Sequence, residues 1–323
     1  MNRPLAFVAA ILAGAVSVSS ACIATPGGPM AFTLQSYSER ADVQLSLRRS
    51  DTPGNGMMSS SFSPAELSGL DLAALRGPGQ HALQFAYVQE PGRLDCSGQG
   101  GNSVATGQCT FTENNAFADF LAARGLGRPS FEQAYDLTIT GATRDLVDAL
   151  AAYHYPRPDI DKLAELAAVK VSRSYIASLV ATGNAPKSLD ELTDFAALGV
   201  TPAYIESLAR AGYRGLSPDE ITDLKAVGAT PELIASLAAA GYAHLSADDL
   251  EQMAALNVTP AFISEFAKLG YTNLPVDTLV DLKALDVTPD YIRSLQAHGL
   301  MPSSADQLVE LKAVGVGDPD TSK

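Results

Sequence analysis

The chain has 323 residues, in which 36 Asp and Glu side chains outnumber 22 Lys and Arg side chains, giving a net charge of −14. So acidic a chain has little with which to neutralise a phosphate backbone or to bind an anionic lipid surface. The charge therefore excludes nucleic acid as a main ligand and argues against adhesion to acidic membranes.

Residues 1–21 have the features of a signal peptide. Arg3 supplies a positive start, residues 5–18 form an uncharged apolar run, and the small residues "SSA" allow cleavage after Ala21. The run is shorter than the roughly 20 apolar residues that a transmembrane helix needs. We expect an exported protein, periplasmic or extracellular, without a transmembrane span, and the loss of Arg3 brings its net charge to −15.

Cys22 directly follows this segment and leaves two alternatives open. Lipid attachment to Cys22 would tether the protein to a membrane, but Ser19 stands where a bacterial lipobox normally has Leu or Val. The other alternative is ordinary cleavage near Ala21 or Ala24.

Residues 30–112 alternate apolar and polar side chains as half-buried strands do. The alternation covers "AFTLQSYS", "DVQLSLRRS", "HALQFAYVQ" and "GQCTFTE", and "SPAELSGLDLAAL" suggests a short helix or turn. The stretches "SDTPGNGMMSSS" and "SGQGGNS" are expected to be loops. Together these patterns predict a small antiparallel β domain.

Cys96 and Cys109 flank a Gly-rich stretch that predicts the two legs of a loop or hairpin. In an exported protein a disulfide between them is the default expectation. A metal site is the alternative, although no third or fourth ligand lies near them in the sequence.

A 29-residue repeat fills the chain from residue 114 to 316 without an insertion or deletion. Each copy begins at a residue that can cap a helix N-terminus, and the seven are Asn114, Thr143, Ser172, Thr201, Thr230, Thr259 and Thr288. Pro follows the last four, in a position where its missing N–H costs nothing. A strict period of this length is typical of a repeat architecture.

Each copy reads as two short helices. In the fourth copy, Tyr204, Ile205 and Leu208 recur at helical spacing, and Gly212 with Tyr213 predicts a Schellman-type end. The second helix starts at the capping box "SPDE", and it ends at Gly228. Its counterparts in the other copies are Gly141, Lys170, Gly199, Asn257, Asp286 and Gly315, of which Lys170 alone is poorly suited to a left-handed backbone.

A single helix pair cannot bury its own apolar face, so we expect the pairs to stack on one another. The prediction is a mainly α protein: an α-solenoid of seven helix pairs over residues 114–316, preceded by the β domain and followed by a polar tail, residues 317–323.

The repeat wording "GVTPxYIxxLxxxGYxxLSxDxLxxLKAxGV" resembles repeats found behind the membrane domain of beta-lactam-sensor-type antirepressor metallopeptidases and in stand-alone exported bacterial proteins. The resemblance covers residues 114–316, and the segment before them is more faintly similar to the β module that often precedes such repeats. The chain lacks the peptidase motif HExxH. The resemblance therefore implies the accessory region and its fold, and not the protease activity.

Searches of the sequence for catalytic chemistry favour no enzyme, and we predict no catalytic, cofactor or metal residues. There is no G-x-G-x-x-G loop in a strand–helix context and no G-x-S-x-G elbow, and the four histidines share no motif with a nucleophile. The carboxylate pairs Asp219–Glu220 and Asp248–Asp249 recur in the first turn of second helices, where they complement the helix dipole. We interpret them as part of the scaffold.

The residues that vary between copies remain as candidates for specificity. They occupy the third, sixth and tenth places of the first helices, and the candidate partner surface comprises Ala203, Glu206, Arg210, Glu232, Lys268, Asp290 and Arg293. Solenoids commonly offer extended surfaces to partners. The favoured hypothesis is a non-catalytic docking, scaffold or sensor-accessory module of the cell envelope that binds another envelope protein or peptide, and the acidic charge favours a basic one.

The alternative is a module or enzyme for an envelope glycan, with the ligand on the β domain. Glycan sites usually present exposed aromatic platforms, and the chain contains no Trp. Exposed aromatic side chains gathered on the β domain would favour this alternative.

Overall fold

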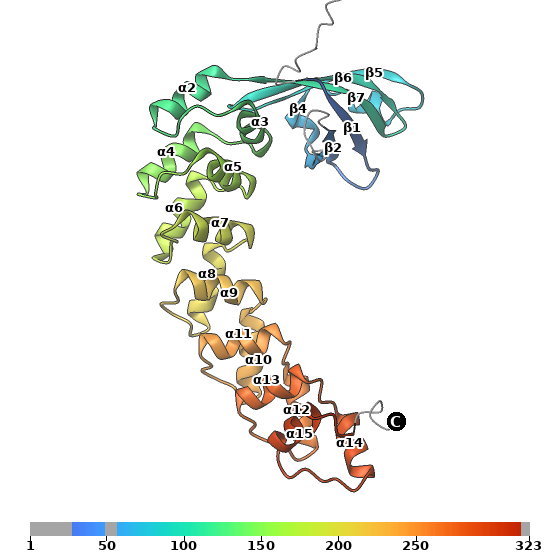
Figure 1. Cartoon of the computed structure of the whole chain (residues 1–323), viewed down its shortest axis with the longest axis vertical. Helices are drawn as coiled ribbons and strands as arrows, with labels where there is room; N and C mark the ends of the chain where they lie inside the picture. Colours follow the sequence, from blue (N-terminus) through green and yellow to red (C-terminus); the bar gives the residue numbers. More distant parts are fainter. Residues whose placement is uncertain (1–27, 49–56, 318–323) are drawn as a thin grey trace, which may run out of the picture. The chain divides into compact units, whose positions relative to one another are not determined.

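A computed structural model describes residues 28–48 and 57–317 (Figure 1). The expected signal peptide, Cys22 and the tail from residue 318 lie outside the described residues. The described residues form 15 α-helices, with 48% of these residues helical, and one seven-stranded antiparallel sheet. It divides into two compact units, one up to Tyr87 with Leu94–Thr112, and one of Val88–Arg93 with the chain from Glu113 onward.

The first unit is built on the sheet, whose strands lie in the order β3-β2-β1-β7-β6-β5-β4. The strands are β1 (Met30–Ser36), β2 (Val43–Arg48), β3 (Met57–Phe62), β4 (Leu67–Ser68), β5 (His81–Val88), β6 (Gly92–Gly101) and β7 (Val104–Glu113). A 3-10 turn, Pro64–Glu66, and a short helix, α1 (Leu72–Arg76), lie between β3 and β5. Alternate side chains of β1, among them Phe32 and Leu34, are buried as the alternation predicts.

The prediction of loops is wrong for residues 57–61 and 97–101, which lie in strands, whereas residues 50–56 of the first predicted loop lie outside the described residues. Met57–Phe62 is strand β3, and β6 continues to Gly101, so that only Asn102 and Ser103 form the turn, both with positive φ. Glycine marks a close approach here and not a loop. A Cβ on Gly98 would lie 2.2 Å from the Thr106 carbonyl oxygen and 2.9 Å from the Phe32 ring.

Cys96 and Cys109 lie on the neighbouring strands β6 and β7 and are bonded to each other, with their Cα atoms 4.0 Å apart. Both side chains are buried. The predicted hairpin and disulfide are therefore confirmed.

The second unit consists of paired helices. First helices begin one residue after each of the seven predicted caps: α2 (Asn115–Ala123), α4 (Arg144–Ala152), α6 (Arg173–Thr182), α8 (Pro202–Arg210), α10 (Pro231–Ala239), α12 (Pro260–Lys268) and α14 (Pro289–Ala297). Each cap side chain accepts a backbone N–H of the first turn, as the sequence predicts.

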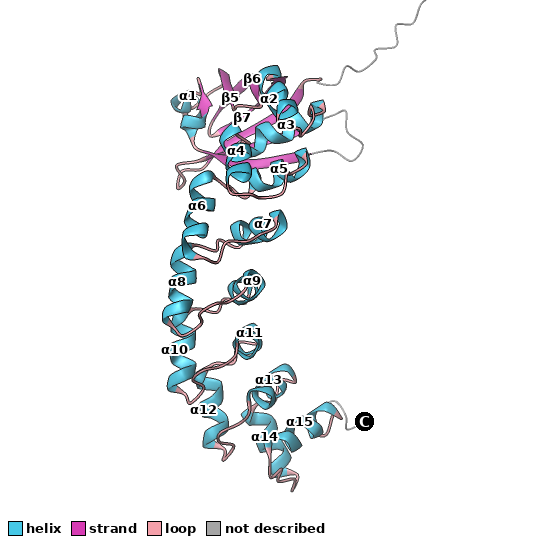
Figure 2. Cartoon of the chain, turned by 90° about the vertical axis from the view of Figure 1, so that its left-hand side faces the viewer, coloured by secondary structure: helices cyan, strands magenta, loops and turns pink. Residues whose placement is uncertain are grey.

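Second helices alternate with them: α3 (Phe131–Thr140), α5 (Ile160–Ala168), α7 (Leu189–Ala197), α9 (Pro218–Ala226), α11 (Ala247–Ala255), α13 (Val276–Ala284) and α15 (Ala305–Ala313). Successive second helices contact one another, and α4, α6 and α8 do the same in the first row. Figure 2 shows the two rows within this unit. The arrangement is thus repeat-like, as the period predicts.

The helix ends follow the sequence analysis closely. The Tyr213 N–H donates to the Leu208 carbonyl, and Gly212 has a φ of 106°, which is the expected Schellman geometry. All seven second-helix stops have positive φ, including Lys170 at 63°. The backbone geometry is therefore kept even where the residue type does not favour it.

One buried residue per first helix repeats along the unit. At the position of Leu208 the side chains are Leu121, Leu150, Leu179, Leu208, Leu237, Phe266 and Leu295, all at most 1% exposed. They belong to hydrophobic clusters that extend from one copy into the next. Burial of this kind stabilises each pair through its neighbours.

Candidate interaction surface

The predicted partner-surface residues are all exposed. They are spread over four first helices, α8, α10, α12 and α14. Asp290 and Arg293 pair with each other within α14. The Arg210 Nε donates to the Glu206 carbonyl oxygen at 3.3 Å, so part of this set is engaged locally.

A more regular feature lies on the second helices. Their second residue, which we call N2, is acidic in every copy: Glu132, Asp161, Asp190, Asp219, Asp248, Asp277 and Asp306. Four residues later, at N6, six of seven copies are acidic as well: Asp136, Glu165, Asp194, Asp223, Asp281 and Glu310, with Gln252 as the exception. Residues four apart share a helix face, so six of the seven second helices present both carboxylates on one side.

The residue between them, at N3, differs between copies and decides how the carboxylates are compensated. Near both ends of the unit, N3 is a donor to the N2 carboxylate of the next second helix. The Gln133 Nε2 lies 2.9 Å from Asp161, and the Thr278 hydroxyl lies 3.1 Å from Asp306.

Lys162, at N3 of α5, also contacts the N2 carboxylate of the next second helix, and it does so with a charged ammonium group. Its Nζ lies 2.7 Å from Asp190 of the next second helix and 2.5 Å from Glu165 at N6 of its own helix. Hydrogen bonds to Asp190 and Glu165 raise the Lys162 pKa, so the ammonium stays charged. An N6 carboxylate and the following N2 carboxylate thus hold one ammonium group between two second helices.

At the three central junctions, N3 is itself acidic. Glu191, Glu220 and Asp249 precede Asp219, Asp248 and Asp277 of the next helices. Glu220 accepts the backbone N–H and the hydroxyl of Ser217, which lowers its pKa. The capping box therefore keeps Glu220 ionised and adds a negative charge where Lys162 supplies a positive one.

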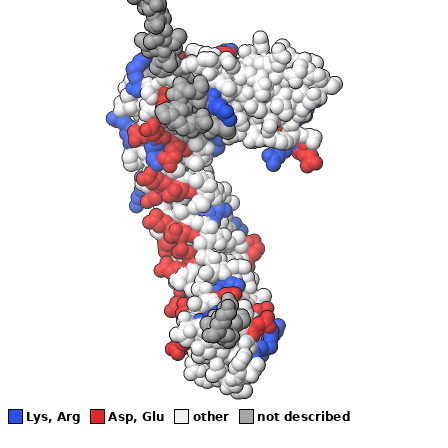
Figure 3. All heavy atoms as spheres, turned by 45° about the vertical axis from the view of Figure 1, so that its right-hand side comes forward, with Lys and Arg blue, Asp and Glu red and all other residues white. Residues whose placement is uncertain are grey.

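The charge of the whole chain is concentrated in this region. Residues 191–287 contain 14 Asp or Glu and 5 Lys or Arg, a net charge of −9, whereas residues 114–190 contain 9 and 8, a net charge of −1. Figure 3 shows Asp and Glu side chains following one another along the helical unit.

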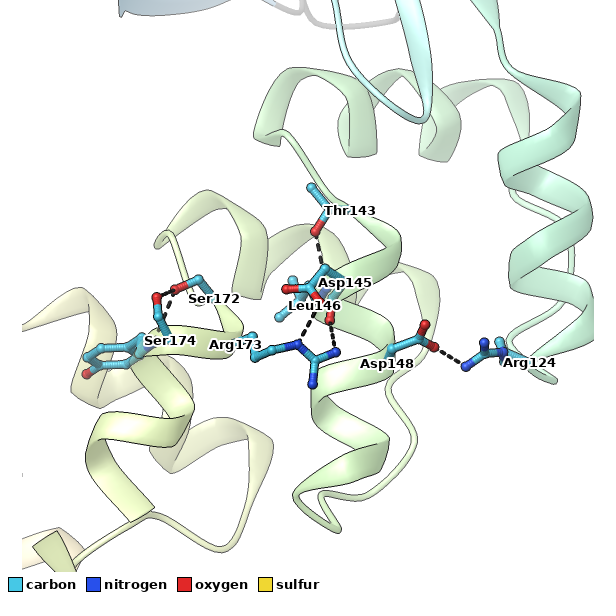
Figure 4. A network of polar contacts seen from close by, with 9 residues as sticks. Arg124, Thr143, Asp145, Leu146, Asp148, Ser172, Arg173 and Ser174 are labelled. Atoms are coloured by element: carbon cyan, nitrogen blue, oxygen red, sulfur yellow. Dashed lines mark hydrogen bonds and ion pairs between the residues drawn. The ribbon is translucent and has the colours of Figure 1, made fainter. Parts of the chain in front are cut away.

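Ion pairs follow the same division. In the early copies Arg173 lies 2.6 Å from Asp145 of the preceding first helix, and Arg124 pairs with Asp148 (Figure 4). In contrast, no carboxylate of residues 191–287 forms an ion pair with any residue that the structure describes.

Two lysines of the central region are placed away from these carboxylates. The Lys225 Nζ lies 4.6 Å from the ring centroid of Tyr204, and the Lys283 Nζ lies 4.9 Å from that of Phe262. Both rings belong to first helices. These cations therefore contribute to contacts between the two rows of helices.

The tyrosines of the helical unit are mainly structural. The hydroxyls of Tyr175, Tyr204 and Tyr291 each donate to a carbonyl 25 residues later. The hydroxyls of Tyr242 and Tyr271 donate to the Leu274 and Pro302 carbonyls, at 2.7 and 2.9 Å, in the loop before the second helix of the following copy. This agrees with the interpretation of the Gly-Tyr motif as part of a helix end.

The histidines also occupy structural positions. His81 and His298 lie 2.9 and 2.8 Å from backbone carbonyl oxygens, and His154 and His244 adopt positive φ in turns. Within residues 28–48 and 57–317 no group of three or more His, Cys, Asp or Glu is placed to hold a metal ion. No helix in the same ranges is long and apolar enough to cross a membrane.

No known family model matches this chain, and no curated protein or solved structure is significantly similar to it.

From the sequence, the carboxylate pairs were expected to complement the helix dipole, and Ser217 with Glu220 was expected to form a capping box, which is present. The change of N3 from donor to acid in the central copies was not predicted. Reading that one position down the aligned copies would have revealed the change.

Proposed function

We propose that the protein is a non-catalytic interaction module of the cell envelope, in which the helical unit docks another envelope protein or peptide. In this proposal the paired helices form an α-solenoid of seven 29-residue units. The chain is exported by its N-terminal segment and is periplasmic or extracellular, with a lipid tether at Cys22 as a further alternative. The resemblance to repeats of sensor-type antirepressor proteins supports an accessory role of this kind.

The observation that carries the proposal is the uncompensated acidic charge of residues 191–287 on regularly stacked helices. The 14 carboxylates in these 97 residues have no ion pairs within the described chain and repel one another, and a basic partner would relieve this repulsion. Electrostatic complementarity between surfaces steers association and selects partners. A partner with a basic surface fits this unit.

The glycan alternative receives less support from the β unit. Tyr37 is the one strongly exposed aromatic side chain in the described residues. Its hydroxyl contacts Gln35 and Gln44, and the Arg40 guanidinium lies 5.6 Å from its ring centroid. A glycan platform would need a cluster of exposed aromatic side chains. Among the described residues Tyr37 alone has this character, and its neighbours are Gln35, Gln44 and Arg40.

Site-specific photo-crosslinking of the full-length protein in native envelopes tests the proposal. A crosslinker is placed at Ala203 or Glu232 on first helices, at Asp219 on a second helix, or at Gln44 on the sheet. We expect a discrete protein adduct from helical positions and none from Gln44. An adduct obtained only from Gln44, or an envelope polymer cleaved by the purified protein, would contradict the proposal.

A further inference from the structure

The chain itself shows what kind of group fits between two second helices. The ammonium of Lys162 sits between Glu165 at N6 and Asp190 at the next N2, at 2.5 and 2.7 Å. Because the copies are 29 residues apart without insertions, the equivalent pairs are Asp194 with Asp219 and Asp223 with Asp248. The same second-helix contacts join α5 to α7, α7 to α9 and α9 to α11.

These two central pairs differ from the Lys162 junction in one respect. Where Lys162 stands, the central copies have Glu191 and Glu220, so that the chain supplies a third carboxylate and no cation. The four paired carboxylates, Asp194, Asp219, Asp223 and Asp248, are all exposed. None of these four side chains forms a hydrogen bond or an ion pair with a described residue.

The junction between α11 and α13 also lacks a cation, but it has one carboxylate fewer. Asp277 at N2 of α13 follows Asp249 at N3 of α11, while N6 of α11 is Gln252. Beyond it, the Thr278 hydroxyl again compensates Asp306. Three successive junctions, between α7 and α13, therefore lack a compensating donor. The junction before them has Lys162, and the junction after them has Thr278.

We propose that these three junctions bind an extended cationic segment of a partner polypeptide, which places one Lys or Arg side chain at each junction as Lys162 does within the chain. This inference rests on the proposed docking function and names the surface and the chemistry of the partner. We define the α7–α13 surface by its six carboxylates: Asp194, Asp219, Asp223, Asp248, Asp249 and Asp277.

The spacing of the junctions sets the register of the partner. Packed helices lie about 8–10 Å apart, and an extended polyproline-type chain advances about 3.1 Å per residue with three residues per turn. Every third side chain of such a segment therefore points the same way, at intervals of about 9 Å. The partner segment should carry basic residues at every third position.

Calorimetric titration of the full-length protein with synthetic peptides at low ionic strength tests this register. The probe is a peptide of nine residues with Lys at every third position, and the controls have the same composition with Lys at every second or every fourth position. We expect the first peptide to bind most tightly. Equal affinity for all three would overturn the proposal, because it would mean non-specific attraction to an acidic protein.

Matched variants locate the surface. Neutralising three of its carboxylates with Asp219→Asn, Asp223→Asn and Asp248→Asn should weaken binding about tenfold, since each exposed pair contributes modestly. The control removes the same charge outside both the candidate partner surface and the α7–α13 surface, with the exposed residues Glu39→Gln, Asp42→Asn and Glu265→Gln, and should change the affinity little. Equal losses from both sets would overturn the assignment.

A variant that is expected to bind more tightly is also needed, because a loss of binding could result from misfolding alone. Lys162→Ala releases the pair Glu165 and Asp190, which extends the row by one junction. A peptide of twelve residues with four lysines in the same register should then bind several-fold more tightly than it binds the unmodified protein. An unchanged affinity would contradict the proposed binding mode.

Small cations provide the last arm. In a competition titration, spermidine or calcium is added to the complex of the protein with the peptide. If either cation displaces the peptide at a concentration equal to that of the peptide, the site binds small cations and the polypeptide assignment is wrong. No peptide binding combined with crosslinking to a protein partner from helical positions would remove the α7–α13 surface and leave the docking function standing.

Discussion

Tyr175 offers a direct test of how neighbouring copies are held together. Its hydroxyl donates to the carbonyl oxygen of Val200 at 2.9 Å, and the Val200 side chain is fully buried. Tyr175→Phe keeps the ring and removes only this bond. We expect a loss of about 1 kcal/mol in the free energy of unfolding at pH 7, which corresponds to a shift of roughly 0.4 M in the urea midpoint for a typical slope.

The same substitution has a predictable pH dependence. Burial raises the pKa of Tyr175 to about 12, and nearby Tyr155 adds to the effect. Because the unfolded value is about 10, the folded state holds the proton more tightly. The stability from Tyr175 is therefore complete below pH 10 and is lost as pH rises through 12.

At pH 11 the pKa shift alone predicts a loss of about 1.4 kcal/mol of the stability that Tyr175 contributes. We halve this loss to about 0.7 kcal/mol because the hydroxyl is only half-buried. The cost of Tyr175→Phe should then shrink from about 1 kcal/mol at pH 7 to about 0.3 kcal/mol at pH 11. Urea unfolding followed by circular dichroism measures both values. Tyr37→Phe, on the exposed face of the sheet, is the control and should cost little at either pH.

The reasoning would be refuted by a cost that stays the same at pH 7 and pH 11, or by no cost at pH 7. The first result would mean that the Tyr175 hydroxyl titrates normally in the folded protein. The second would mean that solvent replaces the bond to Val200.

Three further predictions concern single features of the fold. Lys170→Gly should raise the free energy of unfolding by about 0.5–1 kcal/mol in thermal or urea unfolding, because Lys170 has positive φ, whereas Lys170→Ala should give no such gain. Lys225→Gln should cost about 0.5 kcal/mol only while Tyr204 is present, and a double-mutant cycle with Tyr204→Leu that finds no coupling would contradict the cation–π contact. Replacing Cys96 and Cys109 by Ser should lower the free energy of unfolding by about 2–4 kcal/mol, and mass spectrometry without reductant should find the two cysteines bonded in the exported protein.

The helical unit was the most predictable part of the chain. A cap, a helix stop and a buried Leu each recur every 29 residues, so a weak signal in one copy is repeated in the others. Tyr213 and Gly212 adopt the expected Schellman geometry for this reason. Lys170 is the exception, because it has the positive φ of the other helix stops although its residue type does not favour it.

The sheet was less predictable because glycine has two uses. Gly98 was expected in a loop, yet it lies in strand β6, where the Thr106 carbonyl oxygen and the Phe32 ring are too close for a Cβ. Pairing between strands that are far apart in sequence decides this, and local patterns do not contain it.

The acidic surface was visible in the sequence but was interpreted only in part. Asp219 and Glu220 do serve the helix N-terminus, as expected. The contact of Lys162 with Asp190 indicates that Asp219 also faces the preceding second helix and that Glu220 faces the following one. Only a structure supplies that contact between copies.

The central claim is that the 29-residue units form one continuous docking row, and deleting residues 201–229 tests it most directly. The deletion removes α8 and α9, and joins Val200 to Thr230 in register, so the pair Asp194 with Asp248 replaces two pairs. We expect calorimetry to find that the shortened, still helical protein binds the three-lysine peptide no more tightly than a two-lysine peptide of the same register. Undiminished affinity for the three-lysine peptide, or an unfolded chain, would contradict the account.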